Sequence, residues 1–345
     1  MRKFAVALCV VLAATACGGG GGTGDDTEPT ADATETEPET AASEAEEPAD
    51  EGEGDQEVLS LKVGVIPIID TAPIYMARDN GIFESHGLEV ELVEGQAGAA
   101  AVAAITSGEL DFGFAAPVPE IQAQGQGLDL VVVANAYSQG EELSQAVVTT
   151  ADNPAESIRD LGGMTIAGNA LQAVNELVVR AAYQEAGGDP SELEFIALPY
   201  PDMQAALESG SIDAAFLIEP FLSRAIGSGN FKAVSENPQI ELVGVGSSLS
   251  SYFTSQAYID ANPEAVDRFV AAMAEANEFA DANPDEVRAA IPTFTAIAAE
   301  VAEGIAIGQY LPEVDDAVYE VFGRYMTEYG WIPAEPDLST LLYRP

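Results

Sequence analysis

The sequence predicts an α/β protein of two lobes, each built on a mainly parallel sheet flanked by helices. Strand, helix, strand, helix and strand follow one another between residues 61 and 115, which is typical of a parallel sheet covered by helices. A recurring phrase, Gly-Glu-Leu-Asp at 108–111 and Gly-Ser-Ile-Asp at 210–213, ends a helix before a strand in each half. About 290 residues remain after a low-complexity amino terminus, more than a single core usually organises.

The first lobe opens with an apolar strand, residues 61–66, which ends at Pro67. Pro73 suits the first turn of the helix that follows. Further strands of this stretch are expected at 88–93 and 111–115, and helices at 74–81 and 98–107. Ligands of such sheets sit outside the carboxyl ends of strands, so the loops at 67–73 and 115–119 are the first candidate binding loops.

The remaining elements follow from apolar runs that are bounded by turn residues. Strands are expected at 128–134, 144–150, 193–198, 215–218, 240–245 and 252–257. Helices are expected at 117–125, at 204–210, in a stretch ending near 186, and in three stretches beginning near 263, 284 and 313. The last three helices are expected to be packing elements of the first lobe, since their apolar residues recur at helical spacing.

Several segments resemble one family. Residues 73–83, 87–91 and 108–111 resemble the start of an ABC-transporter solute-binding protein, of the branch that binds nitrate, sulfonates, taurine or thiamine-pyrimidine precursors. Residues 161–168 resemble a later segment, with Met in place of the usual Lys, and 219–221 resemble the Glu-Pro-Phe segment at the cleft of relatives. The resemblance implies a type 2 periplasmic-binding-protein-like fold, a ligand cleft between the lobes, and an ABC permease with its ATPase as partners.

The amino terminus carries the signature of export. Two basic residues precede an apolar run from Phe4 to Ala16, which predicts a secretory signal peptide at 1–17. Residues 14–18 resemble a lipoprotein cleavage box, with Cys17 as the lipidated first residue of the mature chain. The expected location is therefore extracytoplasmic, anchored to the outer face of the cell membrane. The alternative is a simple secreted protein with a free thiol.

Residues 18–57 predict a disordered acidic tether, because they hold few apolar side chains and no Lys or Arg. The whole chain has 58 acidic and 12 basic residues, a net charge of −46. Long-range repulsion then disfavours nucleic acid and anionic membrane surfaces as partners. After the tether, lobe 1 is expected to comprise residues 58–150 and 250–345, and lobe 2 residues 151–249.

The residue inventory favours binding over catalysis. His86 is the only histidine, and Cys9 lies inside the signal peptide, so neither a catalytic triad nor a histidine or cysteine metal site can be assembled. No phosphate-binding Gly-rich loop is present. We expect no enzyme activity, no cofactor and no metal, and a monomer.

Candidate ligand-binding residues lie on the loops that the two lobes turn toward the cleft. They are Ile69, Asp70, Thr71, Ala116, Pro117, Tyr137, Asn169, Gln172, Asn175 and Glu219. Asp70 and Glu219 would pair with a cationic or N–H-rich group, and Tyr137, with Tyr200, could stack or hydrogen-bond. The helix that follows Gly168 would offer backbone N–H groups to an anionic or carbonyl group.

The expected function is capture of a small organic solute for an importer by closure of the two lobes. The candidate loops hold acids, amides and aromatics but no Lys or Arg, which favours a pyrimidine-like or amine-bearing ligand. One alternative is a sulfonate, taurine or nitrate ligand in the same class of importer, because backbone N–H groups alone can hold an anion. Another is a surface sensor or adhesion lipoprotein that keeps the fold but serves no importer.

Overall fold

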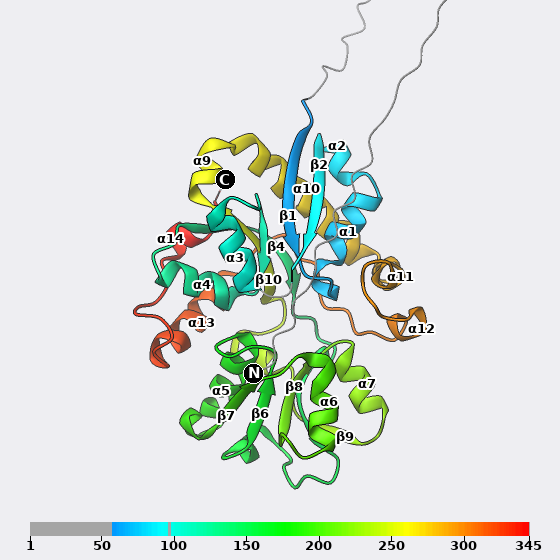
Figure 1. Ribbon diagram of the computed structural model, residues 1–345, viewed down its shortest axis with the longest axis vertical. Coiled ribbons are helices and arrows are strands. Elements are labelled where there is room, and N and C mark those ends of the chain that lie inside the picture. Colours follow the sequence, from blue (N-terminus) through cyan, green and yellow to red (C-terminus); the bar gives the residue numbers. More distant parts are fainter. Residues whose placement is uncertain (1–56, 96–97, 345) are drawn as a thin grey trace, which may run out of the picture. The chain divides into compact units, whose positions relative to one another are not determined.

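A computed structural model describes residues 57–95 and 98–344 (Figure 1). The predicted signal peptide, Cys17 and nearly all of the predicted tether lie outside these residues. Within them, no helix is long and apolar enough to cross a membrane. The chain alternates helices and strands as predicted, and the strands form the sheets of two lobes.

Lobe 1 is built around five strands. These are β1 (Leu59–Val65), β2 (Leu88–Glu94), β3 (Gly113–Ala115), β4 (Leu130–Ser138) and β10 (Ser248–Ser255). β1 and β2 pair in parallel, while β10 lies between β3 and β4 and runs antiparallel to both. A parallel bridge between Val63 and Phe112 brings the two groups of strands together.

Helices cover lobe 1 on both faces because the strands are apolar on both. One core, which includes Val63, Phe112 and Phe269, packs the strands against α1 (Ala72–Asp79) and α10 (Pro263–Ala282). The other face carries α3 (Gly98–Ser107), α4 (Pro117–Gly125), α13 (Asp316–Glu328) and α14 (Leu338–Leu341). The remaining elements of lobe 1 are η1 (Ile69–Thr71), α2 (Ile82–Ser85), α9 (Gln256–Ala261), α11 (Pro284–Phe294) and α12 (Ala299–Ala302).

Lobe 2 is a five-stranded sheet of order β7-β6-β8-β5-β9. Its strands are β5 (Gln145–Thr150), β6 (Thr165–Gly168), β7 (Glu194–Ala197), β8 (Ala214–Ile218) and β9 (Phe231–Glu236). β6 runs parallel to β7 and β8, whereas β5 runs antiparallel to β8 and β9. The flanking elements are η2 (Ile158–Leu161), α5 (Val174–Glu185), η3 (Pro190–Glu192), α6 (Tyr200–Glu208), α7 (Phe221–Gly227) and α8 (Pro238–Val243).

Several details differ from the sequence-based prediction, which includes no strand at β9 (Phe231–Glu236). The predicted lobe boundary at residue 150 includes the strand at 144–150 in lobe 1, although this strand is also expected to cross out of that lobe. β5 hydrogen-bonds to β8 and β9 and so lies in the sheet of lobe 2. The segment at 240–245 was predicted as a strand and is mostly helix α8. Pro238 occupies the first turn of that helix, and Gly244, at φ 87°, ends it.

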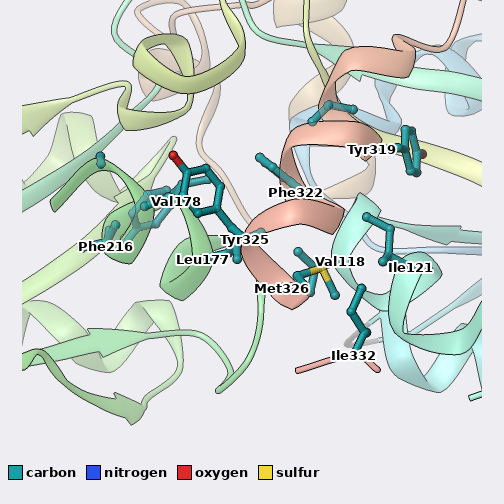
Figure 2. Packing of buried hydrophobic residues seen from close by; sticks show 14 of the residues in the cluster. Val118, Ile121, Leu177, Val178, Phe216, Tyr319, Phe322, Tyr325, Met326 and Ile332 are labelled. Carbon is teal, nitrogen blue, oxygen red and sulfur yellow. The ribbon is translucent and has the colours of Figure 1, made fainter. Parts of the chain in front are cut away.

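Helix α13 connects the cores of the two lobes. Phe322 and Met326 of α13 belong to one buried apolar cluster with Ile121 of α4 and with Leu177 and Val178 of α5 (Figure 2). Hydrogen bonds extend this contact on its exposed side: Tyr325 Oη donates to Glu185 Oε1 at 2.5 Å, and Tyr329 Oη donates to Gln184 Oε1 at 2.8 Å. The lobes are therefore packed together through α13 as well as joined by the chain.

Candidate functional site

The candidate site is a cavity of about 980 Å³ to which both lobes contribute. Lobe 1 supplies the loop after β1 and the α11–α12 segment, and lobe 2 supplies the start of α6 and the segment after β8. Apolar side chains dominate the wall: Ile68, Ile69, Ile218, Phe221, Ile291, Phe294, Ile297, Val301 and Ile305. Such a chamber suits a small organic molecule better than an inorganic ion.

Another cavity, of about 1000 Å³, lies along β1, β2 and α3 within lobe 1 alone. None of the ten predicted ligand-binding residues lines it. Ile69 and Glu219 of that set line the cavity between the lobes. We therefore take the inter-lobe cavity as the candidate site.

The loop after β1 is fixed by buried hydrogen bonds. Thr71 Oγ1 donates to the carbonyl oxygens of Ile66 at 2.7 Å and Ile68 at 2.9 Å. Tyr310 Oη donates to the carbonyl oxygen of Ile69 at 2.9 Å. Thr71 is fully buried and its hydroxyl is committed to the loop, so it holds Ile69 against the cavity and does not line the cavity itself.

Asp70 lies on the same loop, partly buried, beside a group of tyrosines. Its Oδ2 accepts a hydrogen bond from Ser250 Oγ at 2.8 Å, and burial raises the pKa of Asp70 to about 6. Burial and then the charge of Asp70 raise the pKa of Tyr200, which stands at the start of α6 in lobe 2. A carboxylate of lobe 1 thus comes close to a phenol of lobe 2 at the edge of the site.

Three other predicted residues of lobe 1 lie outside the cavity wall. Tyr137 is buried, and its hydroxyl accepts the backbone N–H of Gly308. Burial, with the charge of Asp70 next, raises the pKa of Tyr137 above its usual value. Ala116 and Pro117 form the start of α4, which touches lobe 2 where Gln122 Nε2 donates to the carbonyl oxygen of Gln172 at 3.1 Å.

The predicted site at the start of α5 is occupied by the chain's own side chains. Asn175 Nδ2 donates to Asn169 Oδ1 at 2.5 Å, and the N–H of Gln172 donates to Glu176 Oε2 at 2.7 Å. Glu176 also pairs with Arg180 at 2.8 Å. A carboxylate thus already accepts the Gln172 N–H just before this helix, and binding of an anionic or carbonyl group at the helix start stays a prediction.

Glu219 supplies a buried carboxylate to the cavity at the end of β8. Its side chain accepts from Ser223 Oγ at 2.7 Å and from the Ser223 N–H at 3.2 Å, so it also caps the first turn of α7. Burial raises the pKa of Glu219, and no Lys, Arg or His among residues 57–95 and 98–344 forms an ion pair with it. Glu219 therefore faces the chamber as an acceptor without a cationic partner from the described chain.

Sequence reasoning missed most of the apolar wall. The helices after residue 283 were expected only to pack, yet Phe294, Ile297 and Ile305 line the cavity. Their signal was weak because apolar residues at helical spacing look the same whether they face a core or a ligand chamber. Pro292 inside α11 and the irregular turn before α12 are the features that could have marked this segment.

A guanidinium group was also missed. Arg224, on α7, lines the cavity and is the only Lys or Arg among its wall residues. Its Cζ lies 5.3 Å from the centre of the Phe221 ring, and that ring stacks on Tyr200 at 5.7 Å. The candidate loops do lack Lys and Arg, but the chamber that they help to enclose does not.

The chain belongs to the NMT1/THI5-like family, whose family model matches residues 68–287. It is 24% identical over 204 residues to an Escherichia coli (strain K12) protein named for binding aliphatic sulfonates, a match covering 59% of this chain and 61% of that one. It is 26% identical over 199 residues to the bicarbonate-binding protein CmpA of Synechococcus elongatus, covering 50% and 44%. These matches span less than two thirds of either relative.

The structure is similar to that of the periplasmic aliphatic sulphonate binding protein SsuA from Escherichia coli. The TM-score is 0.69 at 19% sequence identity, and the match covers 83% of this chain and 92% of that one. The predicted type 2 periplasmic-binding-protein-like fold is confirmed. The relatives named here are binding proteins, for aliphatic sulfonates and for bicarbonate.

Proposed function

We propose that this chain is the extracytoplasmic solute-binding component of an ABC importer, and that it captures a small organic solute bearing an amine or an N–H-rich ring. The observation that carries the ligand class is Glu219, a buried carboxylate that faces the cavity without a cationic partner in the described chain. Transferring a charge into such a site is costly unless it is paired. A ligand N–H or ammonium group would supply that pairing.

The shape of the site suits a ligand with an apolar or aromatic body. The stacked rings of Tyr200 and Phe221 stand on one side and the apolar α11–α12 segment on the other. A flat heterocycle could lie against these rings while its N–H groups meet Glu219. Asp70 and Glu94 add further acidic character at the edge, which disfavours a small inorganic anion.

Capture would proceed by closure of the lobes. A ligand that touches both the loop at 67–69 and the segment at 219–224 gains its full set of contacts only when the lobes approach. Such a ligand shifts the population toward the closed form by its difference in affinity for the two forms. The permease would then recognise the closed form. Anchoring through a lipid on Cys17 and action as a monomer belong to the same proposal.

A sulfonate is the second candidate, favoured by Arg224 and by the names of the relatives. A guanidinium group binds sulfonate-like oxygens through paired hydrogen bonds. In this reading Arg224 would hold the anionic head while the apolar wall holds an alkyl chain. A surface sensor or adhesion protein without an importer is the remaining alternative, and binding to membranes that contain the permease would separate it from transport.

Two single substitutions distinguish the ligand classes. We expect Glu219→Gln to weaken binding of a pyrimidine or amine by about 1.5–3 kcal/mol, the range for a hydrogen bond to a charged group, and Arg224→Gln to leave it nearly unchanged. Calorimetric titration of both variants with pyrimidines, amines and alkanesulfonates measures this. Loss of sulfonate binding in Arg224→Gln, with Glu219→Gln unaffected, would establish the second candidate instead.

A further inference from the structure

Glu120 is a fully buried carboxyl group that the candidate site does not use. It lies in the first turn of α4 with no exposed surface. No ion pair with Glu120 is present in the described part of the chain. An ionised carboxylate in such surroundings would be strongly destabilising.

Glu120 forms a closed ring of contacts with two hydroxyl groups. Its Oε1 lies 2.7 Å from Ser251 Oγ, Ser251 Oγ lies 2.9 Å from Tyr319 Oη, and Tyr319 Oη lies 2.7 Å from Glu120 Oε2. Three short oxygen–oxygen contacts need three hydrogens to be hydrogen bonds. The two hydroxyl groups supply two, and a protonated carboxyl group supplies the third.

The ring joins three elements that otherwise come from distant parts of the chain. Glu120 is on α4, Ser251 is on β10 and Tyr319 is on α13. The same helix α13 then reaches lobe 2, where Phe322 and Leu177 belong to one buried cluster (Figure 2). Tyr325 of α13 also donates a hydrogen bond to Glu185. Attachment of α13 to lobe 1 at the ring therefore influences its contact with lobe 2.

The ring also neighbours the candidate site. Ser250, the residue before Ser251 on β10, donates its hydroxyl hydrogen to Asp70 on the loop beside the cavity. Adjacent residues of a strand face opposite sides of its sheet. One pair of serines thus holds the binding loop on one face and the ring on the other.

We propose that Glu120 is held as a neutral carboxylic acid in this ring, and that its ionisation loosens α13 and with it the contact between the lobes. Ionisation breaks the carboxyl O–H bond and releases the proton to bulk water. Two hydrogens then remain for three contacts, so the Ser251–Tyr319 contact becomes one between lone pairs. In support, burial raises the pKa of Glu120 to about 8.

Among the ionisable groups of the elements around the ring, Glu120 is the one that we expect to change its protonation state near pH 8. The elements that pack most extensively against α4 are α3, β4, β10 and α13, and the first three hold no Asp, Glu, Lys, Arg or His. The far end of α4 also contacts the α14 segment, where Gln124 hydrogen-bonds to Asp337 and Thr340. Burial raises the pKa of the tyrosines of β4 and β10, Tyr137 and Tyr252, above 10. On α13, burial and then the charge of Glu120 raise the pKa of Tyr319. The charge of Asp315, at the N-cap of α13, adds to the rise in the pKa of Tyr319. The charged residues of α13 and of its N-cap are exposed or partly exposed: Asp315, Asp316, Glu320, Arg324 and Glu328.

The only tryptophan of the chain makes the proposal measurable without a ligand. Trp331 follows α13 and packs against the same apolar cluster, 6.1 Å from the ring of Tyr329. Titrating the ligand-free protein from pH 6.5 to 9.5, we expect its fluorescence to change with a midpoint near 8. Glu120→Gln should abolish the transition, because the amide can donate to one hydroxyl group and accept from the other at every pH.

A matched control and a second variant sharpen the test. Glu320→Gln makes the same chemical change on the exposed face of α13 and should retain the transition. Tyr319→Phe removes the Ser251–Tyr319 contact that ionisation would leave without a hydrogen, so the change in fluorescence with pH should be smaller than in the unsubstituted protein. Fluorescence that does not change with pH, or a transition that survives unchanged in Glu120→Gln, would overturn the proposal.

An infrared measurement detects the proton itself. At pH 7 the difference spectrum between the unsubstituted protein and Glu120→Gln should contain the carbonyl band of a protonated carboxylic acid, and this band should vanish above pH 9. A carboxylate band at pH 7 in its place would refute the neutral acid. Neither measurement requires a ligand, so failure here is distinct from failure of the proposed transport function.

Discussion

At the scale of single residues, three acids that are buried or partly buried serve different purposes. Glu219 faces the cavity, Asp70 holds the edge of the cavity beside Tyr200, and Glu120 lies in a closed ring away from both. The sequence indicates the first two because each follows an apolar strand. It does not indicate Glu120, whose partners Ser251 and Tyr319 lie 131 and 199 residues further along the chain.

We expect ionised Asp70 to lower the free energy of unfolding at neutral pH. Its folded-state pKa is raised, so its contribution to stability is fully present below pH 3.8, the unfolded value, and is lost as the pH rises through about 6. At pH 7 the ionised group therefore opposes folding. Asp70→Asn removes the charge and retains an acceptor for Ser250.

We therefore expect Asp70→Asn to raise the free energy of unfolding at pH 7 by about 1–2 kcal/mol, since each unit of pKa shift corresponds to 1.36 kcal/mol and the side chain is partly exposed. The gain should disappear below pH 4. Urea unfolding at both pH values measures this. A variant less stable than the unsubstituted protein at pH 7 would show that the charge is better solvated than the structure indicates.

At the scale of elements, local chemistry specified some segments and tertiary context specified others. The strands near 61–66 and 88–93 are recovered because their apolar patterns are long and are bounded by Pro and Gly. The error at 240–245 arose from a short apolar run, which periodicity alone cannot assign to helix or strand. Asn237 and Pro238 before it were the signals for a helix start.

The residues of the candidate site also divide into those that local sequence predicts and those that depend on tertiary contacts. Ile69 and Glu219 could be predicted because they lie on the segments that follow the carboxyl ends of β1 and β8, where chain order alone places them. Thr71, Tyr137 and Asn175 have residue types suited to binding, yet their polar groups are used within the protein. The wall from α11 and α12 depends on how the last segments fold back, which no local pattern encodes.

Helix α13 should be a strong determinant of stability. We expect Phe322→Ala to lower the free energy of unfolding by about 3–5 kcal/mol, because Phe322 is fully buried in the cluster shared by both lobes. Glu320→Ala, on the exposed side of the same helix, should change it by less than about 0.5 kcal/mol. Denaturant unfolding of both variants measures the difference, and equal effects would contradict the packing described for α13.

At the scale of the whole molecule, the division into two lobes follows from the sequence, but the strands that cross between them do not. β5 and β10 each enter a sheet by a short crossover from the other lobe and run antiparallel to their neighbours. An apolar strand has the same sequence pattern in either sheet. Only the hydrogen-bonded pairing of the strands shows that residues 145–150 belong to lobe 2. The remaining lobe boundaries predicted from the sequence stay a proposal.

The central claim is that a solute is captured between the lobes, and an inter-lobe distance tests it most directly. A protein beginning at Glu57 has no native cysteine, so spin labels can be placed through Asp202→Cys and Glu303→Cys, exposed residues near the two sides of the cavity. Electron–electron double resonance would report the distance with and without each ligand class. We predict a shorter and narrower distribution with a pyrimidine or amine, lost in Glu219→Gln. A distribution that no solute of any class changes would contradict capture by lobe closure.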